Sequence, residues 1–243
     1  MHVSKLRAAL LGTALAFGVG AAQAAPTTAL YLSMDGSGSI TGSQFTNQVN
    51  GYVSALNSFF SSNPTAYGQV AIGANIFGVN VSEFFAVQTI TDSTVLGQLT
   101  TAISDLDPGR NGISTGATSI GDAVTAATSS LLAFETAEGV DLRLLIDVTT
   151  DGVNNNGENP TTAAGNASAA GVNQVNCLGI GGGASCSWVS IYGTDFGTVS
   201  FENLGDALAT KIRTEVFGVP EPMSLALFGL GLAGLATLRR RAD

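Results

Sequence analysis

Short apolar runs alternate with amphipathic segments through the middle of the chain, and this alternation limits the possible folds more than any other feature. Continuous apolar runs of this length are typical of strands buried on both faces. Residues 29–34 (ALYLSM) and 142–148 (LRLLIDV) have this pattern. Residues 41–60 lie between them and place apolar side chains every three or four positions, which predicts an amphipathic helix. Strands that alternate with helices form a mostly parallel sheet with helices on both faces.

The remaining segments complete an α/β pattern. Residues 70–77 and 81–90 are β-rich runs separated by residues 78–80 (GVN), which predicts an antiparallel hairpin. Residues 188–201 are expected to be extended or irregular. Further helices are expected at 92–106, 119–134, 161–170 and 202–216, and a further strand at 172–180. The predicted fold is therefore a doubly wound, mostly parallel sheet with one antiparallel edge strand.

The N-terminal end has the pattern of a secretion signal. Lys5 and Arg7 precede an apolar run at 8–22, which closes on Ala22-Gln23-Ala24. A charged segment, an apolar segment and a small-x-small cleavage site in this order are typical of a signal peptide. A buried N-terminal helix is the alternative, but it would not require small residues at those two places. We therefore assign residues 1–24 to a signal peptide.

An apolar run at 223–238 lies near the other end, after Pro220, Glu221 and Pro222 and before three arginines. As a helix its length is about 24 Å, slightly below the ~30 Å hydrocarbon core of a bilayer. The arginines favour the cytoplasmic side, which leaves the body outside and agrees with the N-terminal signal. An ordinary core helix would need a polar face, and this run has none. We expect residues 223–238 to form a transmembrane helix.

This tail resembles the PEP-CTERM sorting signal of Gram-negative bacteria. The resemblance covers residues 219–243 and rests on the Pro-Glu-Pro motif, the apolar run and the arginines in that order. It implies a membrane enzyme, exosortase, that recognises and cleaves the tail, and a host that forms biofilms. The implied location is the inner membrane facing the periplasm, followed by the cell surface or the extracellular matrix. The body between the two terminal segments is then residues 25–218.

Removal of both ends leaves an acidic body. Four basic and 16 acidic residues remain, which gives a net charge of about −12. A surface of this charge repels nucleic acid and anionic polysaccharide unless cations intervene. We therefore expect no nucleic-acid partner.

The chain has two cysteines, Cys177 and Cys186, which bracket a run of glycines at 181–183. In an oxidising compartment such a pair forms a disulfide that closes a small loop. A metal-binding pair is the alternative, but no nearby ligand supports it. We predict the disulfide.

Side chains with oxygen atoms gather where strands are predicted to end. Asp35, Ser37 and Ser39 belong to an Asp-Gly-Ser-Gly-Ser segment directly after the first strand. Thr118 follows a glycine-containing loop at the start of a helix, and Asp151 ends the central strand. Ligands of open α/β sheets bind beyond the carboxyl ends of the strands, and hard oxygens suit Mg²⁺, Mn²⁺ or Ca²⁺. The alternative is a serine-rich turn and two helix caps.

Together these five residues resemble the metal-ion-dependent adhesion site (MIDAS) of von Willebrand factor A domains. The similarity extends over residues 27–217, and residues 146–155 are closer still to a bacterial von Willebrand A subfamily of unknown function. The resemblance implies a Rossmann-like von Willebrand A fold and one divalent ion. Ser37, Ser39 and Thr118 would contact the ion directly, and the two aspartates would supply charge directly or through water. One coordination position would remain for an acidic group of a protein or matrix ligand.

The sequence argues against an enzyme. The one histidine, His2, leaves with the signal peptide, so the mature chain has no Ser-His-Asp or Cys-His set and no histidine-bound catalytic zinc. Metal-assisted hydrolysis is a further alternative, but no second feature supports it. The leading hypothesis is a cation-dependent adhesion module, and the second is a structural matrix protein whose metal site only stabilises the fold. Asp147 lies inside the central strand and is expected to be a buried carboxylate rather than a sixth ligand.

Overall fold

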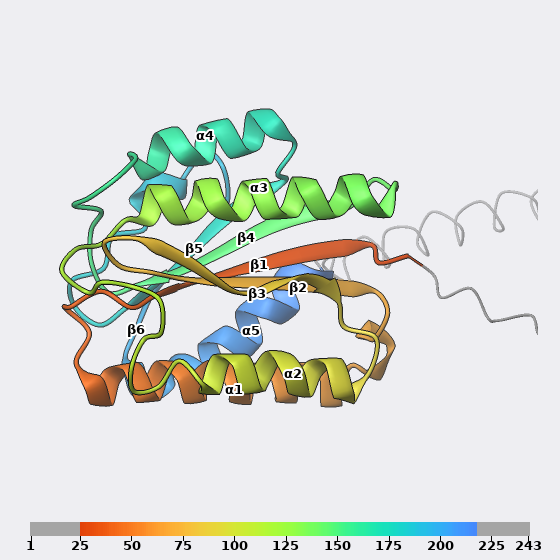
Figure 1. Cartoon of the computed structure of the whole chain (residues 1–243), viewed down its shortest axis with the longest axis horizontal. Coiled ribbons are helices and arrows are strands. Elements are labelled where there is room, and N and C mark those ends of the chain that lie inside the picture. The colour runs from red at the N-terminus through yellow and green to blue at the C-terminus, as the bar shows by residue number, and fades with distance from the viewer. Residues whose placement is uncertain (1–24, 218–243) are drawn as a thin grey trace, which may run out of the picture.

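The computed structural model describes residues 25–217, which form a six-stranded sheet between two layers of helices (Figure 1). The strands are β1 (Thr28–Asp35), β2 (Val70–Phe77), β3 (Val81–Thr89), β4 (Arg143–Thr150), β5 (Gln174–Ile180) and β6 (Asp195–Val199). The helices are α1 (Gly42–Ser62), α2 (Ser93–Ser104), α3 (Ile120–Glu138), α4 (Pro160–Ala170) and α5 (Leu204–Phe217). Short 3-10 helices span Pro64–Ala66, Ser187–Val189 and Phe201–Asn203.

The strand order is β3-β2-β1-β4-β5-β6, and every pairing is parallel except that of β2 with β3. The doubly wound sheet with one antiparallel edge strand is therefore confirmed. β6 is an addition to the prediction, because the sequence indicates only extended or irregular chain at 188–201. This strand pairs in parallel with β5 through a register shift and is mostly exposed. It contains Gly197 with a φ of 77° and lacks the apolar run that identifies a buried strand.

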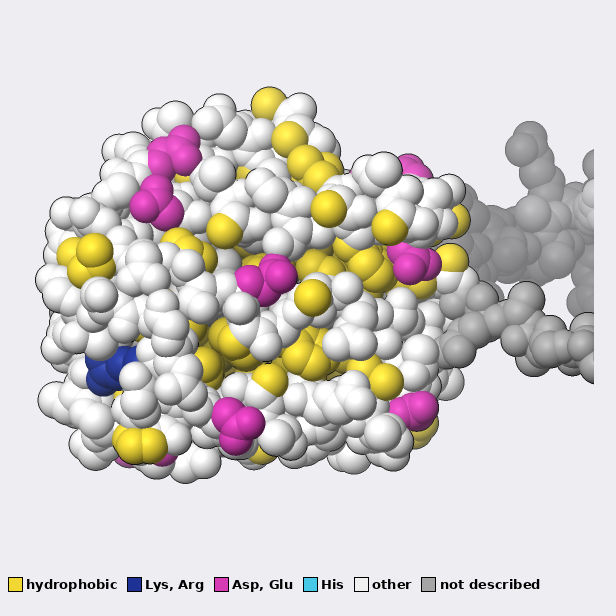
Figure 2. Space-filling view, viewed as in Figure 1, with side chains coloured by type: hydrophobic (Ala, Val, Ile, Leu, Met, Phe, Trp, Pro, Cys, Tyr) yellow, Lys and Arg dark blue, Asp and Glu magenta, His cyan; other side chains and the backbone are white. Residues whose placement is uncertain are grey.

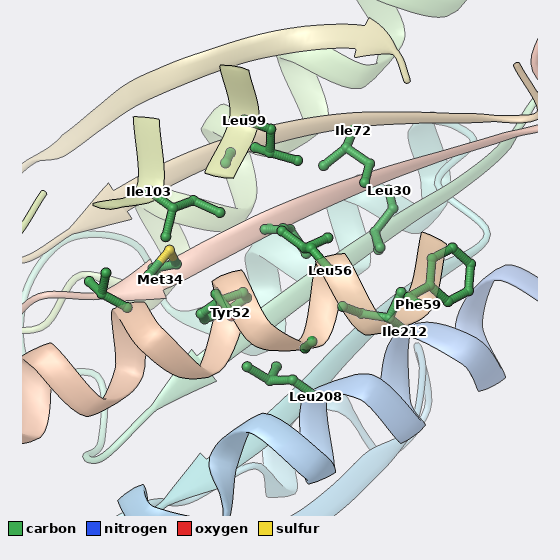
Figure 3. Packing of buried hydrophobic residues seen from close by; sticks show 14 of the residues in the cluster. Leu30, Met34, Tyr52, Leu56, Phe59, Ile72, Leu99, Ile103, Leu208 and Ile212 are labelled. Carbon is green, nitrogen blue, oxygen red and sulfur yellow. The ribbon is translucent and has the colours of Figure 1, made fainter. Parts of the chain in front are cut away.

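The helices cover both faces of the sheet: α1, α2 and α5 lie on one side, and α3 and α4 lie on the other (Figure 1). Successive side chains of a strand point to opposite faces, so β1 contributes to both layers. Leu30 and Met34 pack with α1, α2 and α5, whereas Ala29 and Tyr31 belong to the core under α3 and α4. Figure 3 shows the first of these cores, where side chains from the sheet and the three helices meet.

A local sequence signal fixes the start of α1. The Thr41 side chain accepts a hydrogen bond from the backbone N–H of Gln44, and the Gln44 side chain accepts one from the backbone N–H of Thr41. This reciprocal pair is a capping box, which satisfies two backbone donors that a helix leaves free. Only the short segment 36–41 therefore separates the end of β1 from the helix.

The carboxyl ends of β1 and β4 lie where the direction of winding reverses. The chain leaves β1 through α1 towards β2 and leaves β4 through α4 towards β5, and these two helices lie on opposite faces. The loops diverge at such a point, and ligands of doubly wound sheets bind in the crevice between them. At the opposite edge, Arg143 at the start of β4 donates a hydrogen bond to the backbone carbonyl of Glu215 in α5. The C-terminal end of α5 therefore lies at the edge of the sheet away from this crevice.

A disulfide joins Cys177 in β5 to Cys186, with the two Cα atoms 5.5 Å apart. Replacing both cysteines by alanine should lower the free energy of unfolding by about 2–3 kcal/mol, because the unfolded chain no longer contains a closed loop. Urea unfolding of the variant and of the oxidised protein measures the difference. An equal free energy of unfolding for the two proteins would contradict this prediction.

Several predictions fall on residues that lie outside the described part of the chain. These are the signal peptide at 1–24, the Pro-Glu-Pro motif at 220–222 and the membrane helix at 223–238. Within residues 25–217, no helix is both long enough and apolar enough to cross a bilayer. The boundaries of the terminal segments remain predictions from the sequence.

Candidate metal centre

Asp35 ends β1 and is completely buried. One carboxylate oxygen accepts a hydrogen bond from the backbone N–H of Ser37 at 2.8 Å, and the other accepts one from the Thr150 hydroxyl at 2.6 Å. Thr150 is the last residue of β4, so this carboxylate connects the ends of the two central strands. Gln48 of α1 donates a hydrogen bond to the Asp35 backbone carbonyl at 3.0 Å. The position of the carboxylate is therefore fixed by the sheet and by α1.

A chain of hydrogen bonds continues from this loop to the residue after β4. The hydroxyl oxygens of Ser37 and Ser39 lie 3.1 Å apart, and the Ser39 hydroxyl donates to Oδ1 of Asp151 at 2.7 Å. Ser37 is buried, Asp151 is half-buried and Ser39 is exposed. The structure thus brings four of the five candidate residues into one network that extends from the core to the solvent.

Thr118 approaches the network from the loop before α3. Its backbone N–H donates to the Asn155 side chain at 2.8 Å, and its carbonyl accepts hydrogen bonds from the N–H groups of Asn155 and Asn156. Both asparagines belong to the loop that follows Asp151. Thr118 is therefore attached to the Asp151 loop through its backbone, and within residues 25–217 its hydroxyl makes no hydrogen bond to the other four candidates.

Helix capping does not account for Thr118 or Asp151. The cap position of α3 is occupied by Ser119, whose hydroxyl donates to the Val79 carbonyl instead of capping the helix. The cap of α4 is Asn159, whose side chain accepts hydrogen bonds from two backbone N–H groups. The alternative of two helix caps therefore leaves these two candidate residues unexplained.

Glycine is required where the Asp-Gly-Ser-Gly-Ser loop meets its neighbour. A Cβ atom at Gly38 would lie 2.7 Å from the backbone oxygen of Thr115, and one at Gly36 would lie 2.7 Å from Cδ1 of Ile113. A backbone oxygen cannot move aside as a flexible side chain can, so the clash at Gly38 is the more severe. The two glycines allow the loop after β1 to pack against the loop that carries Thr118.

Arg110 holds the same loop and was missed by the sequence analysis. Its guanidinium donates hydrogen bonds to the backbone carbonyls of Gly36 at 2.9 Å, Ser37 at 2.6 Å, and Ile40. The side chain is 8% exposed, and the guanidinium carbon lies 4.8 Å from the centre of the Phe45 ring. The sequence feature that could have identified Arg110 is the rarity of basic side chains, because residues 25–218 contain only four of them. Arg110 is the one that lies in a loop of Gly, Ser and Thr, between Asp35 and Asp151 in the sequence.

Burial raises the pKa of Asp35 to about 6. Hydrogen bonds from Ser37 and Thr150 lower it, and the nearby charge of Asp151 raises it further. Both the burial and the second carboxylate disfavour the ionised form of Asp35. A cation placed between the two carboxylates would remove this disadvantage.

Cation binding should weaken as the pH falls below about 6, by about tenfold per pH unit, because a proton on Asp35 competes with the ion. Without a cation, the stability of the folded protein changes with pH in the opposite direction. The pKa of Asp35 is higher in the folded state than its ordinary value of 3.8, so stability is lost as the pH rises from that value to about 6. Calorimetric titration with Mg²⁺ at about pH 5 and about pH 7 tests the first statement. Equal affinities at the two pH values would contradict it.

The residues present fit a hard divalent ion. Two carboxylates and three hydroxyls are oxygen donors of the kind that Mg²⁺, Mn²⁺ and Ca²⁺ prefer. Residues 25–217 contain no group of three or more His, Cys, Asp or Glu side chains that could hold a metal. A metal site at this edge of the sheet would therefore need oxygen donors besides carboxylates, and the loop after β1 supplies two hydroxyls.

Comparison with known proteins gives a family and a sorting motif. Residues 25–195 match the family described as "Protein of unknown function (DUF1194)", and residues 218–241 match the PEP-CTERM protein-sorting motif. No curated protein matches the chain. The first match covers most of the body, and the second coincides with the tail and indicates an exported protein.

Solved structures share the fold at low sequence identity. Proximal thread matrix protein 1 from the mussel byssus is 23% identical with a TM-score of 0.63, over 80% of this chain and 49% of its own. One structure of that protein has zinc in its MIDAS motif. Manganese-loaded TRAP protein from Plasmodium vivax is 19% identical with a TM-score of 0.56, over 78% of this chain and 73% of its own. A von Willebrand factor type A protein from Catenulispora acidiphila is 14% identical with a TM-score of 0.58, over 79% of this chain and 43% of its own.

The present chain spans about half the length of the mussel protein, and the likeness to all three structures concerns the fold. The strand order and the two helix layers agree with that likeness. The chain belongs to the DUF1194 family, has a von Willebrand A-type fold and carries a PEP-CTERM sorting motif at its C-terminal end.

Proposed function

We propose that this protein is a non-catalytic, cation-dependent adhesion or protein-interaction module of the bacterial cell surface or extracellular matrix. One divalent ion, Mg²⁺ or in its place Mn²⁺ or Ca²⁺, would be held by Asp35, Ser37, Ser39, Thr118 and Asp151. The partner would be a protein or matrix ligand that offers a carboxylate to the ion. The observation that carries the proposal is the network of hydroxyl and carboxylate oxygens between the ends of β1 and β4.

The spacing of these oxygens supports the proposal. Two ligands at right angles around an ion with bonds of about 2.1 Å lie about 3 Å apart. The separations are 3.1 Å between the two serine hydroxyls and 2.7 Å between Ser39 and Asp151. An ion could therefore replace the hydrogen bonds of the network without a large movement of the side chains.

The charge of the body explains why a carboxylate ligand would need the ion. Acidic side chains are scattered over the face shown in Figure 2, and basic ones are rare on it. A surface of this kind repels a partner's carboxylate. A divalent ion would cancel the charge of the two carboxylates and offer a coordination position to the partner's carboxylate, so that removal of the ion should abolish binding instead of weakening it slightly.

The position of the network suits an anchored protein. The network lies at the carboxyl edge of the sheet, whereas Glu215 near the end of α5 is hydrogen-bonded to Arg143 at the amino edge. The residues that follow α5 include the sorting motif. A body attached through that end would present the candidate site away from the attachment point.

Arg110 distinguishes this proposal from a purely structural role of the metal. The guanidinium already holds two backbone carbonyls of the Asp-Gly-Ser-Gly-Ser loop and that of Ile40, the residue after it. Protein groups therefore fix the loop, and an ion is expected to contribute more to ligand binding than to folding.

A capture experiment with the exported protein tests the proposal. The exported protein is immobilised and incubated with native extracellular matrix in Mg²⁺, in EDTA, and in EDTA followed by excess Mg²⁺. Circular dichroism of the protein alone in the same three solutions monitors the fold. We expect partners to bind only when the divalent ion is present and the fold to survive chelation. Loss of the fold in EDTA would favour the structural role, and capture that is unaffected by EDTA would contradict a metal-dependent site.

Processing of the tail is expected to release the protein. The PEP-CTERM motif at 218–241 implies recognition by exosortase. Mass spectrometry of the form released from the surface should therefore find residues 223–243 missing. A released form with an intact C-terminus would contradict cleavage but not membrane anchoring.

A further inference from the structure

A lysine and two acidic side chains lie together in the core between the sheet and α5, outside the candidate metal centre. Lys211 and Glu215 are one turn apart on α5, and Asp147 lies in β4. None of them is more than 2% exposed. Lys211 Nζ donates a hydrogen bond to Glu215 Oε1 at 2.6 Å and forms an ion pair with Oδ1 of Asp147. Lys211 is the only lysine in residues 25–218.

The Asp147 carboxylate has an unfavourable environment for a charged group. Neither of its oxygens accepts a hydrogen bond from any described residue. The ammonium of Lys211 contacts Oδ1 at ion-pair distance but outside the angular range of a hydrogen bond. A buried carboxylate needs both a charge partner and hydrogen bonds to be stable, and Asp147 has only the charge partner.

The charges of the three groups do not balance when all are ionised. One ammonium faces two carboxylates, and burial penalises the excess negative charge. Burial and the charge of Asp147 raise the pKa of Glu215, which favours its protonated form. Moving one proton from Lys211 to Asp147 then gives an amine and two carboxylic acids, all uncharged, in the same positions.

The surroundings position the groups and keep water away. The Lys211 ammonium lies 4.8 Å from the centre of the Phe196 ring of β6. The Asn176 side chain of β5 donates a hydrogen bond to Glu215 Oε1 at 2.8 Å, and its own carbonyl oxygen accepts one from the backbone N–H of Thr194. Figure 3 shows the apolar layer that α5 forms with α1, to which Ile212 beside the lysine belongs.

We infer that Lys211 and Asp147 become joined by an intramolecular isopeptide bond, with Glu215 as the group that carries the proton. The uncharged Nζ attacks Cγ of the protonated Asp147 side chain, and a C–N bond forms. Glu215 donates its proton to the leaving hydroxyl and takes one from the nitrogen. The C–O bond breaks, one water molecule leaves, and an amide remains. No oxidant or reductant is consumed.

The bond would have a mechanical consequence for the fold. α5 is the last helix of the described chain, and β4 is a central strand of the sheet. An amide between them would transmit a pull on the C-terminal end directly to the centre of the sheet. α5 could then not separate from the body while the protein is attached through its tail.

Trypsin provides a direct test, because it does not cleave after an acylated lysine. The full-length protein is denatured, reduced, alkylated and digested, which cuts the chain after Arg143. We expect a peptide of residues 144–213 that is lighter by one water molecule. A peptide of residues 144–211 with its full mass would overturn the inference. Dehydration at Asp151-Gly152 would give the same loss of mass, but it would leave Lys211 open to cleavage and would also count against the bond.

Three variants assign the roles of the groups in the same digest. Asp147→Ala should restore cleavage after Lys211, and circular dichroism shows whether this variant folds. Glu215→Gln should fold, as judged by circular dichroism, and should also be cleaved after Lys211. Glu202→Gln, which changes an exposed carboxyl group in the 3-10 helix before α5, should keep the bond. A cross-link that persists in Asp147→Ala would exclude Asp147 as the acceptor, and one that persists in Glu215→Gln would exclude the role of Glu215.

Discussion

Replacing Asp35 or Asp151 by alanine is expected to lower the affinity for Mg²⁺ by more than about 100-fold. Loss of a group that merely orients a metal ligand costs about 10–100-fold, and these two side chains would supply the negative charge that faces the ion. Ser37→Ala and Ser39→Ala each remove one uncharged oxygen and should cost about 10–100-fold. Calorimetric titration of the full-length protein with Mg²⁺ and with Mn²⁺ measures the affinities.

The control for this experiment is Asp141→Ala. Asp141 is exposed and precedes β4 at the opposite edge of the sheet from Asp151, so its removal changes the net charge equally without touching the network. Binding by this variant should equal that of the unmodified protein. Circular dichroism should show that Asp151→Ala keeps the fold, because a half-buried loop carboxylate contributes little to the core. Unchanged affinity in both Asp35→Ala and Asp151→Ala would eliminate the metal-site interpretation.

Much of the fold follows from short-range patterns in the sequence. A buried strand such as β4 is a continuous apolar run, and a helix such as α1 has a capping box and a regular apolar stripe. The carboxyl ends of parallel strands lie at the same edge of a sheet. The positions of Asp35 and Asp151 at strand ends were therefore sufficient to place both residues at that edge. The same reasoning could not find β6, whose side chains are mostly exposed and whose pairing depends on β5.

Contacts between distant segments explain what the sequence could not provide. Asp147 was correctly expected to be a buried carboxylate, but its partner Lys211 lies on a helix that reaches β4 only through the packing of α5 on the sheet. Arg110 occurs in a loop without a periodic pattern, and its three carbonyl partners lie more than 65 residues earlier in the chain. No spacing rule connects such residues, since their neighbours are determined by the complete fold.

Arg110→Met should lower the free energy of unfolding by about 2–4 kcal/mol, because it leaves buried backbone carbonyls without a donor. Methionine retains most of the apolar stem that packs near Phe45 but removes the guanidinium, which also ends its contact with the Phe45 ring. The effect should be largest in the Asp-Gly-Ser-Gly-Ser loop. Urea unfolding measures the overall loss of stability, and amide hydrogen exchange at residues 36–40 should become faster than in the unmodified protein.

Arg213→Met is the matched control, because Arg213 is exposed on α5 and its loss changes the net charge by the same amount. This variant should unfold within about 0.5 kcal/mol of the unmodified protein. Arg110→Lys separates charge from geometry, since a lysine keeps the positive charge near Asp35 but has a single nitrogen in place of the planar guanidinium. If charge alone mattered, Arg110→Lys would be as stable as the unmodified protein. We expect it to be destabilised nearly as much as Arg110→Met, because the guanidinium holds the carbonyls of Gly36, Ser37 and Ile40 at the same time.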